Sequence, residues 1–556
     1  MKKTMLWVLV MLLVVSLFAG IPAGVAEEKG EIVNGVYRYH DTVDIEVMVR
    51  YPAEHIPDPS TAWLYAWARE NMNINFIVEG MPVEATQERT PLMFVDDSEL
   101  PHILLNWADL NSLAKQTVYG DQEGKLVALQ DYITPELMPN LHATLEAMPD
   151  VWALISTLDG NVYNFPRFFQ DIRYNVNMGF EPLWYDSALF EGLGIAVPTT
   201  TDELLEALRA IKAADPNGVG TSLVPLGGSF EQGDMAPALL NAFGFNLTSQ
   251  RWNLLALRDG DYQTGELLNY QTHPVFFEYL KFMNTLYTEG LMDPDYYTLD
   301  RTQTYAKLTA GYNAVMPTFD IYNMPPESWQ NWRIFEPLTS PFNSEKMMSN
   351  APFNGGPCYY AFITNQCPPE QLEAFLRFMD AGYGSEHSVR YYYGPEFEKE
   401  DGYGLLKGWY MAEDGITYVY EDVVDGTFAS NTAYVYNVGP FGATGNRFNR
   451  RTDGSEVALY SRDTQFGMRC LENIEKLDPY LSAKYPGALF DADTAIRIGD
   501  LEDALQDHAD SEIAKFITGA RALTQEEFDK FVAEMNALGL DEFMEIQLTA
   551  FEAQFR

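Results

Sequence analysis

The chain has 556 residues, of which 80 are acidic and 36 are basic, so its formal net charge is −44. Such an excess of negative charge repels nucleic acid and anionic membrane surfaces, and it argues against binding to either as the main function. A chain of this length exceeds one ordinary hydrophobic core, so we expect two lobes or more.

Residues 1–26 have the composition of a secretion signal. Lys2 and Lys3 form a charged start, an apolar run follows over 5–18, and the small residues at 24–26 form a cleavage site. We expect cleavage, and an uncleaved membrane anchor is the alternative. No cysteine lies near the site, so a lipid anchor is not expected. The mature protein should be free in the periplasm or outside the cell.

The sequence contains three cysteines, a low and odd number for a secreted chain of this size. Cys358 and Cys367 flank a predicted strand over 359–364. An extended strand would hold their Cα atoms roughly 25–30 Å apart, which is beyond the reach of a disulfide. We therefore expect three free thiols.

The first predicted unit after the signal is a β-α-β arrangement. Apolar residues alternate from Val43 to Val49, a helix is expected from Thr61 to about Asn71, and a second strand over 73–78. This order implies a parallel sheet. We interpret Trp63 and Trp67, four residues apart on the helix, as core residues, with ligand contact as the alternative.

Polar and aromatic residues follow the next predicted strand. Asn106, Trp107 and Asp109 come directly after the apolar residues 103–105. Open α/β sheets bind their ligands at the carboxyl ends of the strands, so these side chains are candidates for a binding cleft. The alternative for Trp107 is a ring packed beneath the loop.

A turn signal at Asp159 and Gly160 separates two apolar segments. We expect Ile155 on one side, and Val162 with Tyr163 on the other, to lie on paired strands.

Four predicted helices each carry one apolar stripe. Capping boxes open two of them, Thr200 with Glu203 and Thr524 with Glu527. The stripes are Leu204, Leu205, Leu208 and Ile211; Phe276, Leu280, Met283 and Tyr287; Leu372, Phe375, Leu376 and Met379; and Phe528, Phe531, Val532, Met535 and Leu538.

Three stretches carry a family resemblance. They are W-Y-D-S-A-L-F-E-G-L-G-I-A-V-P-T-T-T-D-E-L from Trp184, L-Y-T-E-G-L-M-D-P-D-Y from Leu286, and A-K-F-I-T-G from Ala514. They resemble extracellular solute-binding proteins of ABC-type carbohydrate importers, in the long subgroup that includes alginate- and oligosaccharide-binding lipoproteins. With weaker matches between them, the resemblance covers nearly the whole mature chain.

The resemblance implies an α/β, two-lobed, periplasmic-binding-protein-like fold of type II. Each lobe would be a mainly parallel sheet flanked by helices, with the ligand cleft between the lobes. We expect the signal peptide at 1–26, lobe 1 at 27–165 plus about 345–400, and lobe 2 at 166–344 plus about 401–556. The C-terminal helices could pack across both lobes.

The resemblance further implies a monomeric, non-enzymatic receptor that passes an oligosaccharide to a membrane permease. Flat aromatic rings cover the C–H face of a sugar, while polar side chains bond to its hydroxyl groups. Loop aromatics and nearby polar residues are therefore the candidate ligand contacts. They are Asn106, Trp107, Asp109, Tyr163, Phe165, Arg167, Tyr174, Trp184, Trp252, Phe319, Tyr322 and Trp409.

Two other functions stay open. A receptor for peptides or other polar solutes would share this fold, and a secreted glycoside hydrolase would need two carboxylates about 5–10 Å apart across the cleft. The sequence has no nucleotide-binding loop and no histidines at metal-ligand spacing. We interpret Asp293 and Asp295 as part of a turn after a helix, because they flank Pro294 and have no acid–base partner nearby.

A calcium loop written DPNGNGKxDEIP is frequent in long members of the family. Here residues 215–225 read D-P-N-G-V-G-T-S-L-V-P, which is one residue shorter, has Val219 in place of an asparagine and lacks the Asp-Glu pair. Calcium requires six or more oxygen ligands. We expect the site to be lost, with Asp215 and Asn217 as its remaining ligands, and we expect no cofactor.

Overall fold

The structure is a computed structural model that describes most of the chain. The described residues are 29–51, 58–110, 112–147, 150–165, 167–168, 182–230, 235–247, 254–318, 324–325, 328–350, 355–356, 361–384, 387, 390–391, 407–411, 418–422 and 476–556. The predicted signal, Cys358 and Cys470 lie outside them. Cys367 is a free thiol whose pKa is raised to about 12 by burial. No helix of the described segments is long and apolar enough to cross a membrane.

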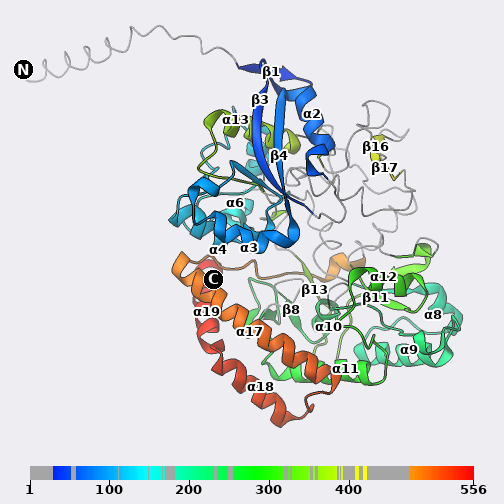
Figure 1. Cartoon of the computed structure of the whole chain (residues 1–556). Helices are drawn as coiled ribbons and strands as arrows, with labels where there is room; N and C mark the ends of the chain where they lie inside the picture. Colours follow the sequence, from blue (N-terminus) through cyan, green and yellow to red (C-terminus); the bar gives the residue numbers. More distant parts are fainter. Residues whose placement is uncertain are drawn as a thin grey trace, which may run out of the picture.

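The ribbon forms two bodies, an upper and a lower one in Figure 1. The upper body contains β1 (Gly30–Val33), β2 (Val36–Tyr39), β3 (Val43–Tyr51), α2 (Trp63–Met72), β4 (Ile74–Pro82), α3 (Val83–Met93), β5 (Ile103–Leu105), α4 (Leu113–Gln116), α5 (Pro139–Ala147), α6 (Asp150–Ile155), β15 (Ala361–Ile363) and α13 (Pro369–Tyr383).

The lower body is larger. It contains β7 (Leu183–Asp186), α8 (Ser187–Leu193), α9 (Thr201–Ala214), α10 (Ala236–Ala242), β8 (Phe245–Leu247), β9 (Leu255–Arg258), β10 (Glu266–Asn269), α11 (Pro274–Thr288), α12 (Arg301–Thr309), β11 (Val315–Pro317), β12 (Trp332–Ile334), β13 (Met348–Asn350), β18 (Leu481–Ala483), α17 (Ala492–Thr518), α18 (Gln525–Ala537) and α19 (Leu540–Phe555). Two further strands, β16 (Lys407–Met411) and β17 (Tyr418–Asp422), pair antiparallel with each other.

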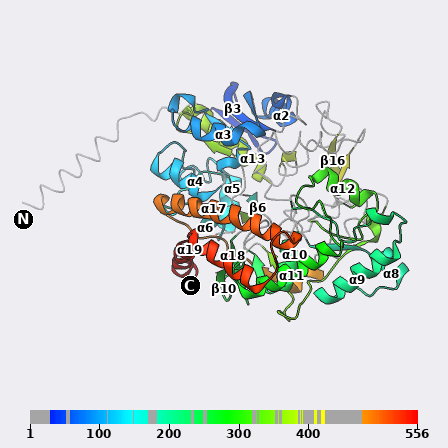
Figure 2. The ribbon, with the colours of Figure 1, turned by 60° about the horizontal axis from the view of Figure 1, so that its bottom comes forward.

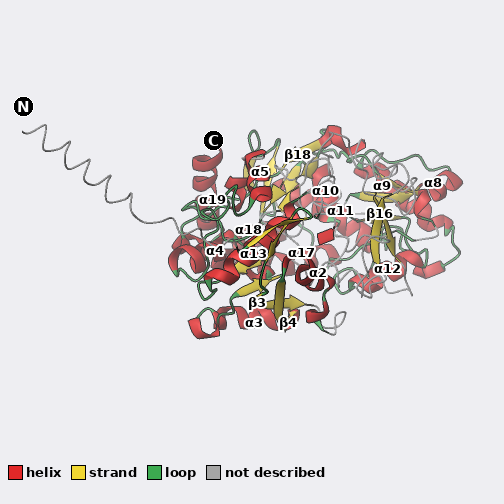
Figure 3. Ribbon diagram, turned by 90° about the horizontal axis from the view of Figure 1, so that it is seen from above, coloured by secondary structure: helices red, strands yellow, loops and turns green. Residues whose placement is uncertain are grey.

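The sheet of the upper body has the order β4-β3-β5-β15. β3 is parallel to β4 and to β5, whereas β15 is antiparallel to β5. Helix α2 connects β3 to β4 and buries Trp63 and Trp67. The predicted parallel β-α-β unit and the core position of both tryptophans are therefore confirmed. Figure 3 shows β3 and β4 with α2, α3 and α13 around them.

The main sheet of the lower body is built around β7. β7 is antiparallel to both β11 and β12, while Leu226 forms parallel bridges with Val315 in β11 and with Met292. β7 therefore runs against the other four segments of this sheet, which are β11, β12 and the segments at Leu226 and Met292. β7 and β15 are each the first strand of a main sheet after the chain passes from one body to the other. This arrangement confirms the predicted two-lobed α/β fold of type II.

The four predicted apolar stripes lie on α9, α11, α13 and α18, and their residues are buried or half-buried except Leu538. Leu538 is 39% exposed because it ends α18. At α9, Thr200 Oγ1 accepts a hydrogen bond from the Glu203 backbone, as a capping box requires. The Glu203 carboxylate, however, accepts from the Thr199 backbone instead of that of Thr200.

Each body has its own hydrophobic core. The upper core draws on residues 36–165 and 361–391, and the lower one on 183–348 and 477–551. Met348 belongs to the lower core, although the sequence placed residues from about 345 in the first lobe. Two short strands, β6 (Arg167–Phe168) and β14 (Gly355–Gly356), pair antiparallel next to the two crossings of the chain.

Helix α17 extends from the lower body to the upper one. It contacts α4 and the π-helical segment η4 (Thr117–Gln122) of the upper body, as well as α11, α18 and α19 of the lower body. Figure 2 shows α17 lying between α4 and α18.

One predicted strand is wrong. Ile155 is the last residue of helix α6, where it and Val151 are buried on one face at helical spacing. The adjacent Ser156 forms a single antiparallel bridge with Val162. The turn at Gly160 is therefore present, but a helix instead of a strand precedes it.

Candidate ligand-binding site

A polar group lies where two neighbouring strands of the upper sheet end. Arg50 is the penultimate residue of β3, and Asp109 follows β5. Arg50 Nε lies 3.8 Å from Asp109 Oδ2, and it donates a hydrogen bond of 3.3 Å to Thr86 Oγ1. Because β3 and β5 are parallel, their carboxyl ends meet at one edge of the sheet, which is the usual ligand-binding edge of such sheets.

The hydrogen bonds of this polar group are incomplete. Asp109 Oδ2 is buried and accepts no hydrogen bond from any described residue, and only the Arg50 charge lies near it. The preceding Asn106 is 7% exposed and has a left-handed backbone with φ of 57°. Side chains held in this way can exchange partners for the hydroxyl groups of a ligand. The sequence analysis did not indicate Arg50, although a charged residue directly after the buried run 47–49 of a strand is a signal for it.

Two of the predicted stacking rings are buried tryptophans with a satisfied indole. Trp107 is 0% exposed, and its Nε1 donates to Thr90 Oγ1 at 2.8 Å. Trp184 is 1% exposed and donates to the carbonyl oxygen of Thr318 at 2.9 Å. Both rings lie in hydrophobic cores, so we correct their predicted role from ligand contact to packing. For Trp107 this is the alternative named above, a ring beneath its loop.

Two further predicted rings, Tyr163 and Phe165, are also buried. The Tyr163 hydroxyl donates to Asp121 Oδ1 at 2.8 Å, and burial raises its pKa. Its ring lies so close to Gly120 that a Cβ there would come within 2.3 Å of it. Phe165 is 0% exposed and packs edge-on against Phe375. We correct both to packing residues, because the segment after Val162 turns into the core.

The other predicted ligand contacts lie outside the described residues or are described by their backbone alone. Tyr174, Trp252, Phe319 and Tyr322 lie outside the described residues. Arg167 and Trp409 are described by their backbone alone, in β6 and β16.

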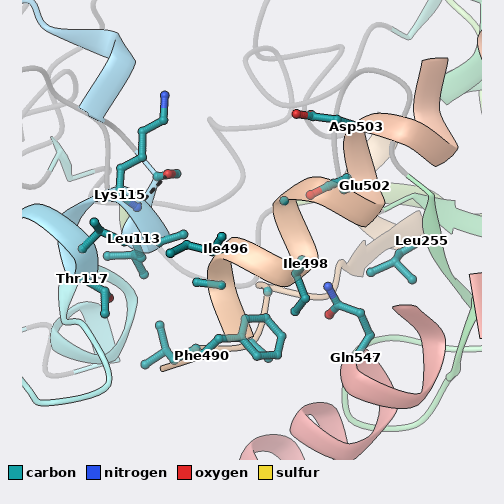
Figure 4. A pocket seen from close by; sticks show the side chains of 18 of the residues that line it. Leu113, Lys115, Thr117, Leu255, Phe490, Ile496, Ile498, Glu502, Asp503 and Gln547 are labelled. Atoms are coloured by element: carbon teal, nitrogen blue, oxygen red, sulfur yellow. Dashed lines mark hydrogen bonds between the residues drawn. The ribbon is translucent and has the colours of Figure 1, made fainter. Parts of the chain in front are cut away.

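A cavity of about 680 Å³ lies between the two bodies. The upper body contributes residues of α4, and the lower body contributes Phe490 and the first three turns of α17. In Figure 4 the side chains of Leu113 and Ile496 point toward each other across the gap. Ile496 is 52% exposed, which is unusual for an isoleucine on a helix that packs elsewhere. The cavity therefore has an apolar base that remains accessible.

The walls of the same cavity are polar. Glu502 and Asp503 extend from α17 toward the side on which α4 carries Lys115 (Figure 4). Burial, followed by the charge of Asp503, raises the pKa of Glu502. Gln547 of α19 also lines the cavity and is 7% exposed. Donors, acceptors and apolar surface thus face one space that both bodies enclose.

The loop after α9 is closed by its own side chains. Asp215 has φ of 41°, and its carboxylate oxygens accept hydrogen bonds from the backbone of Val219 at 3.0 Å and Gly220 at 2.9 Å. Asn217 Nδ2 donates to the carbonyl oxygen of Gly311 at 2.7 Å. Among the described residues no group of three or more His, Cys, Asp or Glu side chains could hold a metal ion. These residues therefore do not fit a calcium ion.

We predict that calcium does not stabilise this protein. Because backbone N–H groups already occupy the Asp215 carboxylate, neither EDTA nor millimolar calcium should move the unfolding temperature by more than about 1 °C. Asp215→Ala should instead lower the free energy of unfolding by about 1–2 kcal/mol, through the loss of the two side-chain hydrogen bonds that close the loop and a strained left-handed alanine. Thermal unfolding of both proteins, with and without calcium, measures this. A calcium-dependent rise that Asp215→Ala abolishes would show that the site is retained.

The carboxylate pair at Asp293 and Asp295 has a structural role. Asp293 is buried, and Lys307 Nζ lies 2.8 Å from its Oδ2. Asp293 Oδ1 also accepts a hydrogen bond from the Asp295 backbone at 3.0 Å. This ion pair and turn confirm the interpretation made from the sequence.

Comparison with known proteins identifies relatives. Residues 109–325 match the family "Bacterial extracellular solute-binding protein". The fructooligosaccharide ABC transporter substrate-binding protein FusA of Streptococcus pneumoniae is 26% identical over 298 residues. This alignment covers 52% of the present chain and 50% of FusA, so the match spans about half the length of that relative.

Solved structures extend the likeness along the chain. FusA in complex with kestose has a TM-score of 0.71 at 20% identity, covering 92% of this chain and 99% of that one. An extracellular solute-binding protein from Bifidobacterium longum subsp. infantis has a TM-score of 0.71 at 15% identity, covering 93% and 99%. The alginate-binding protein AlgQ2 without calcium ion has a TM-score of 0.66 at 16% identity, covering 92% and 98%.

At these identities the solved structures show the fold alone. The resemblance drawn from the sequence is confirmed as a resemblance, because residues 109–325 match the family of bacterial extracellular solute-binding proteins and the fold is that of two-lobed proteins of this kind.

Proposed function

We propose that this protein captures an oligosaccharide between its lobes and delivers it to the permease of an ABC importer. The observation that carries the proposal is the family match together with a two-lobed fold shared along 92% of the chain with FusA, which was solved with kestose. The FusA name states a fructooligosaccharide as its transported solute. We further propose that the chain acts as a secreted monomer without chemical catalysis.

Capture would proceed by closure of the two lobes. We propose lobe 1 at 27–165 plus about 351–400 and lobe 2 at 166–350 plus about 401–556, because β13 pairs with β18 in the lower body. A ligand that contacts both lobes only in the closed state shifts the population toward closure. The segments next to β6 and β14, where the chain crosses, are the candidates for the hinge.

The proposed contacts differ from the list that the sequence suggested. Arg50 joins Asn106 and Asp109 as a polar group at the sheet edge, because Asp109 Oδ2 accepts no hydrogen bond from a described residue and lies 3.8 Å from Arg50 Nε. The rings retained as stacking candidates are Tyr174, Trp252, Phe319, Tyr322 and Trp409, with Arg167 as a further polar contact. A micromolar ligand requires roughly 8 kcal/mol of binding free energy. Two or three stacked rings and several hydrogen bonds would supply it.

Isothermal titration calorimetry tests the function. We expect heat of binding from at least one neutral oligosaccharide in a panel that includes kestose and nystose, and none from peptides of similar size. Asp109→Asn should weaken that binding roughly tenfold, since hydrogen bonds to a charged group contribute about 1.5–3 kcal/mol. Binding of peptides alone would establish the other type of receptor. Release of reducing sugar with time would instead indicate a hydrolase.

A further inference from the structure

The cavity between α4 and α17 is lined by a side-chain donor that makes no hydrogen bond to a described residue. Gln547 is 7% exposed, and its Oε1 accepts a hydrogen bond of 3.4 Å from the Tyr485 hydroxyl. Its Nε2 has no acceptor among the described residues, and in Figure 4 it points into the cavity. An amide N–H that faces a cavity takes its acceptor from water or from a ligand. This nitrogen therefore marks a position for an acceptor atom.

Hydrogen-bond acceptors in this cavity come mainly from two carboxylates. Glu502 and Asp503 offer several acceptor oxygens from one side of α17, and Lys115 is the one described cation that lines the cavity. Carboxylates accept hydrogen bonds from hydroxyl groups, and they repel other anions more strongly in a partly enclosed space than in water. The exposed Ile496 and the half-buried Leu113 supply the apolar surface that the C–H face of a sugar ring requires.

We propose that this cavity is a subsite for one uncharged sugar unit, and that Glu502 and Asp503 exclude acidic sugars such as uronates. The ligand's hydroxyl groups donate to the two carboxylates, a ring or hydroxyl oxygen accepts from Gln547, and the C–H face lies on Ile496 and Leu113. This inference rests on the proposed oligosaccharide function, and it adds the charge class that the site accepts.

The first test changes the charge and keeps the shape. Wild type should bind nystose. The double variant Glu502→Gln, Asp503→Asn should bind trigalacturonate at least tenfold more tightly than wild type does. Nystose affinity should stay within about threefold, because the amides keep an acceptor oxygen. Asp507→Asn, which removes one exposed negative charge from the same helix outside the cavity, is the control and should alter neither. Equal trigalacturonate binding by wild type and the double variant would overturn the exclusion.

The second test fills the cavity. Gly499 lines it, and a Cβ at this position would meet no atom within 4 Å. Gly499→Phe should therefore place its ring in the cavity and weaken nystose binding at least tenfold, or about 1.4 kcal/mol. Gly499→Ala is the matched control, with unchanged affinity and an equal or higher unfolding temperature.

The outcomes distinguish a failure of the proposed subsite from a failure of the proposed oligosaccharide capture. If wild type and Gly499→Phe bind nystose equally, the cavity is not a subsite, while oligosaccharide capture stands. If wild type binds no neutral oligosaccharide of the panel, the proposed function itself fails. If Gly499→Phe lowers the unfolding temperature by more than a few degrees, Gly499→Leu replaces it, and unchanged nystose binding by that variant overturns the proposal.

Discussion

Trp107→Ala is expected to lower the free energy of unfolding of the first lobe by about 3–5 kcal/mol, the usual range for removing a buried tryptophan. Its ring packs among Met48, Phe94, Leu104 and Phe362, and it is 0% exposed. The substitution leaves a cavity in that cluster, and it removes the indole N–H that donates a hydrogen bond to Thr90 Oγ1. Urea unfolding, followed by a probe in the first lobe, measures the change, since the two lobes need not unfold together.

Trp107→Phe separates packing from ligand contact. It keeps most of the ring and loses the indole donor, so we expect a cost of about 1–2 kcal/mol in stability and an oligosaccharide affinity within about twofold of wild type. Val95→Ala, at an 80% exposed position nearby, should be close to neutral in both measurements. A large loss of affinity in a stable Trp107→Phe protein would restore the role that the sequence suggested for this residue.

Regular elements were predictable because their periodicity is local. The alternation in β3, the stripe of α9 and the repeat of Phe276, Leu280 and Met283 on α11 follow from the spacing of apolar residues alone. The main sheet of the lower body shows where this information ends. Leu226 and Met292 join it through single parallel bridges, and one residue has no periodicity to detect. The strand direction of β7 likewise depends on the chain crossing between the lobes.

The binding residues were harder to predict than the fold. Trp184 and Tyr163 stand beside turn residues in the sequence, which suggested rings in open loops. The direction of a side chain at such a position depends on tertiary packing, and both rings turn inward to a hydrogen-bond partner. Conversely, Gln547 and Glu502 belong to amphipathic helices, where the sequence predicts a solvated face. Their meeting at a cavity depends on how α17 and α19 pack.

Buried acidic groups were also missed, although they influence stability. Asp380 is 5% exposed in α13, beside the apolar stripe that the sequence did indicate. Its carboxylate accepts hydrogen bonds from the Leu141 backbone at 2.9 Å and from Asn140 Nδ2 at 2.8 Å. It thereby connects α13 to the first turn of α5. Burial outweighs these hydrogen bonds and raises the pKa of Asp380 to about 6.

The raised pKa of Asp380 predicts that stability falls as pH rises from about 4 to about 6. In this window the folded protein holds a proton that the unfolded chain, with a pKa near 3.9, has lost. The contribution of this proton is fully present below pH 4 and lost as pH passes 6, a change of about 3 kcal/mol. Asp510, whose pKa burial also raises to about 6, should add a smaller change of the same sign because it is partly exposed.

Urea unfolding of wild type and Asp380→Asn between pH 4.5 and 8 measures this effect. Asparagine resembles the protonated acid in shape and does not titrate, so the variant should lose about 2 kcal/mol of the pH dependence over this range, which begins above the unfolded pKa, and be the more stable protein at pH 8. The difference between the two proteins cancels the general repulsion that a net charge of −44 adds at high pH. Asp41→Asn, at an exposed bend between β2 and β3, controls for removing one charge. Parallel pH profiles for wild type and Asp380→Asn would show that the Asp380 carboxylate is ionised in the folded protein throughout this range.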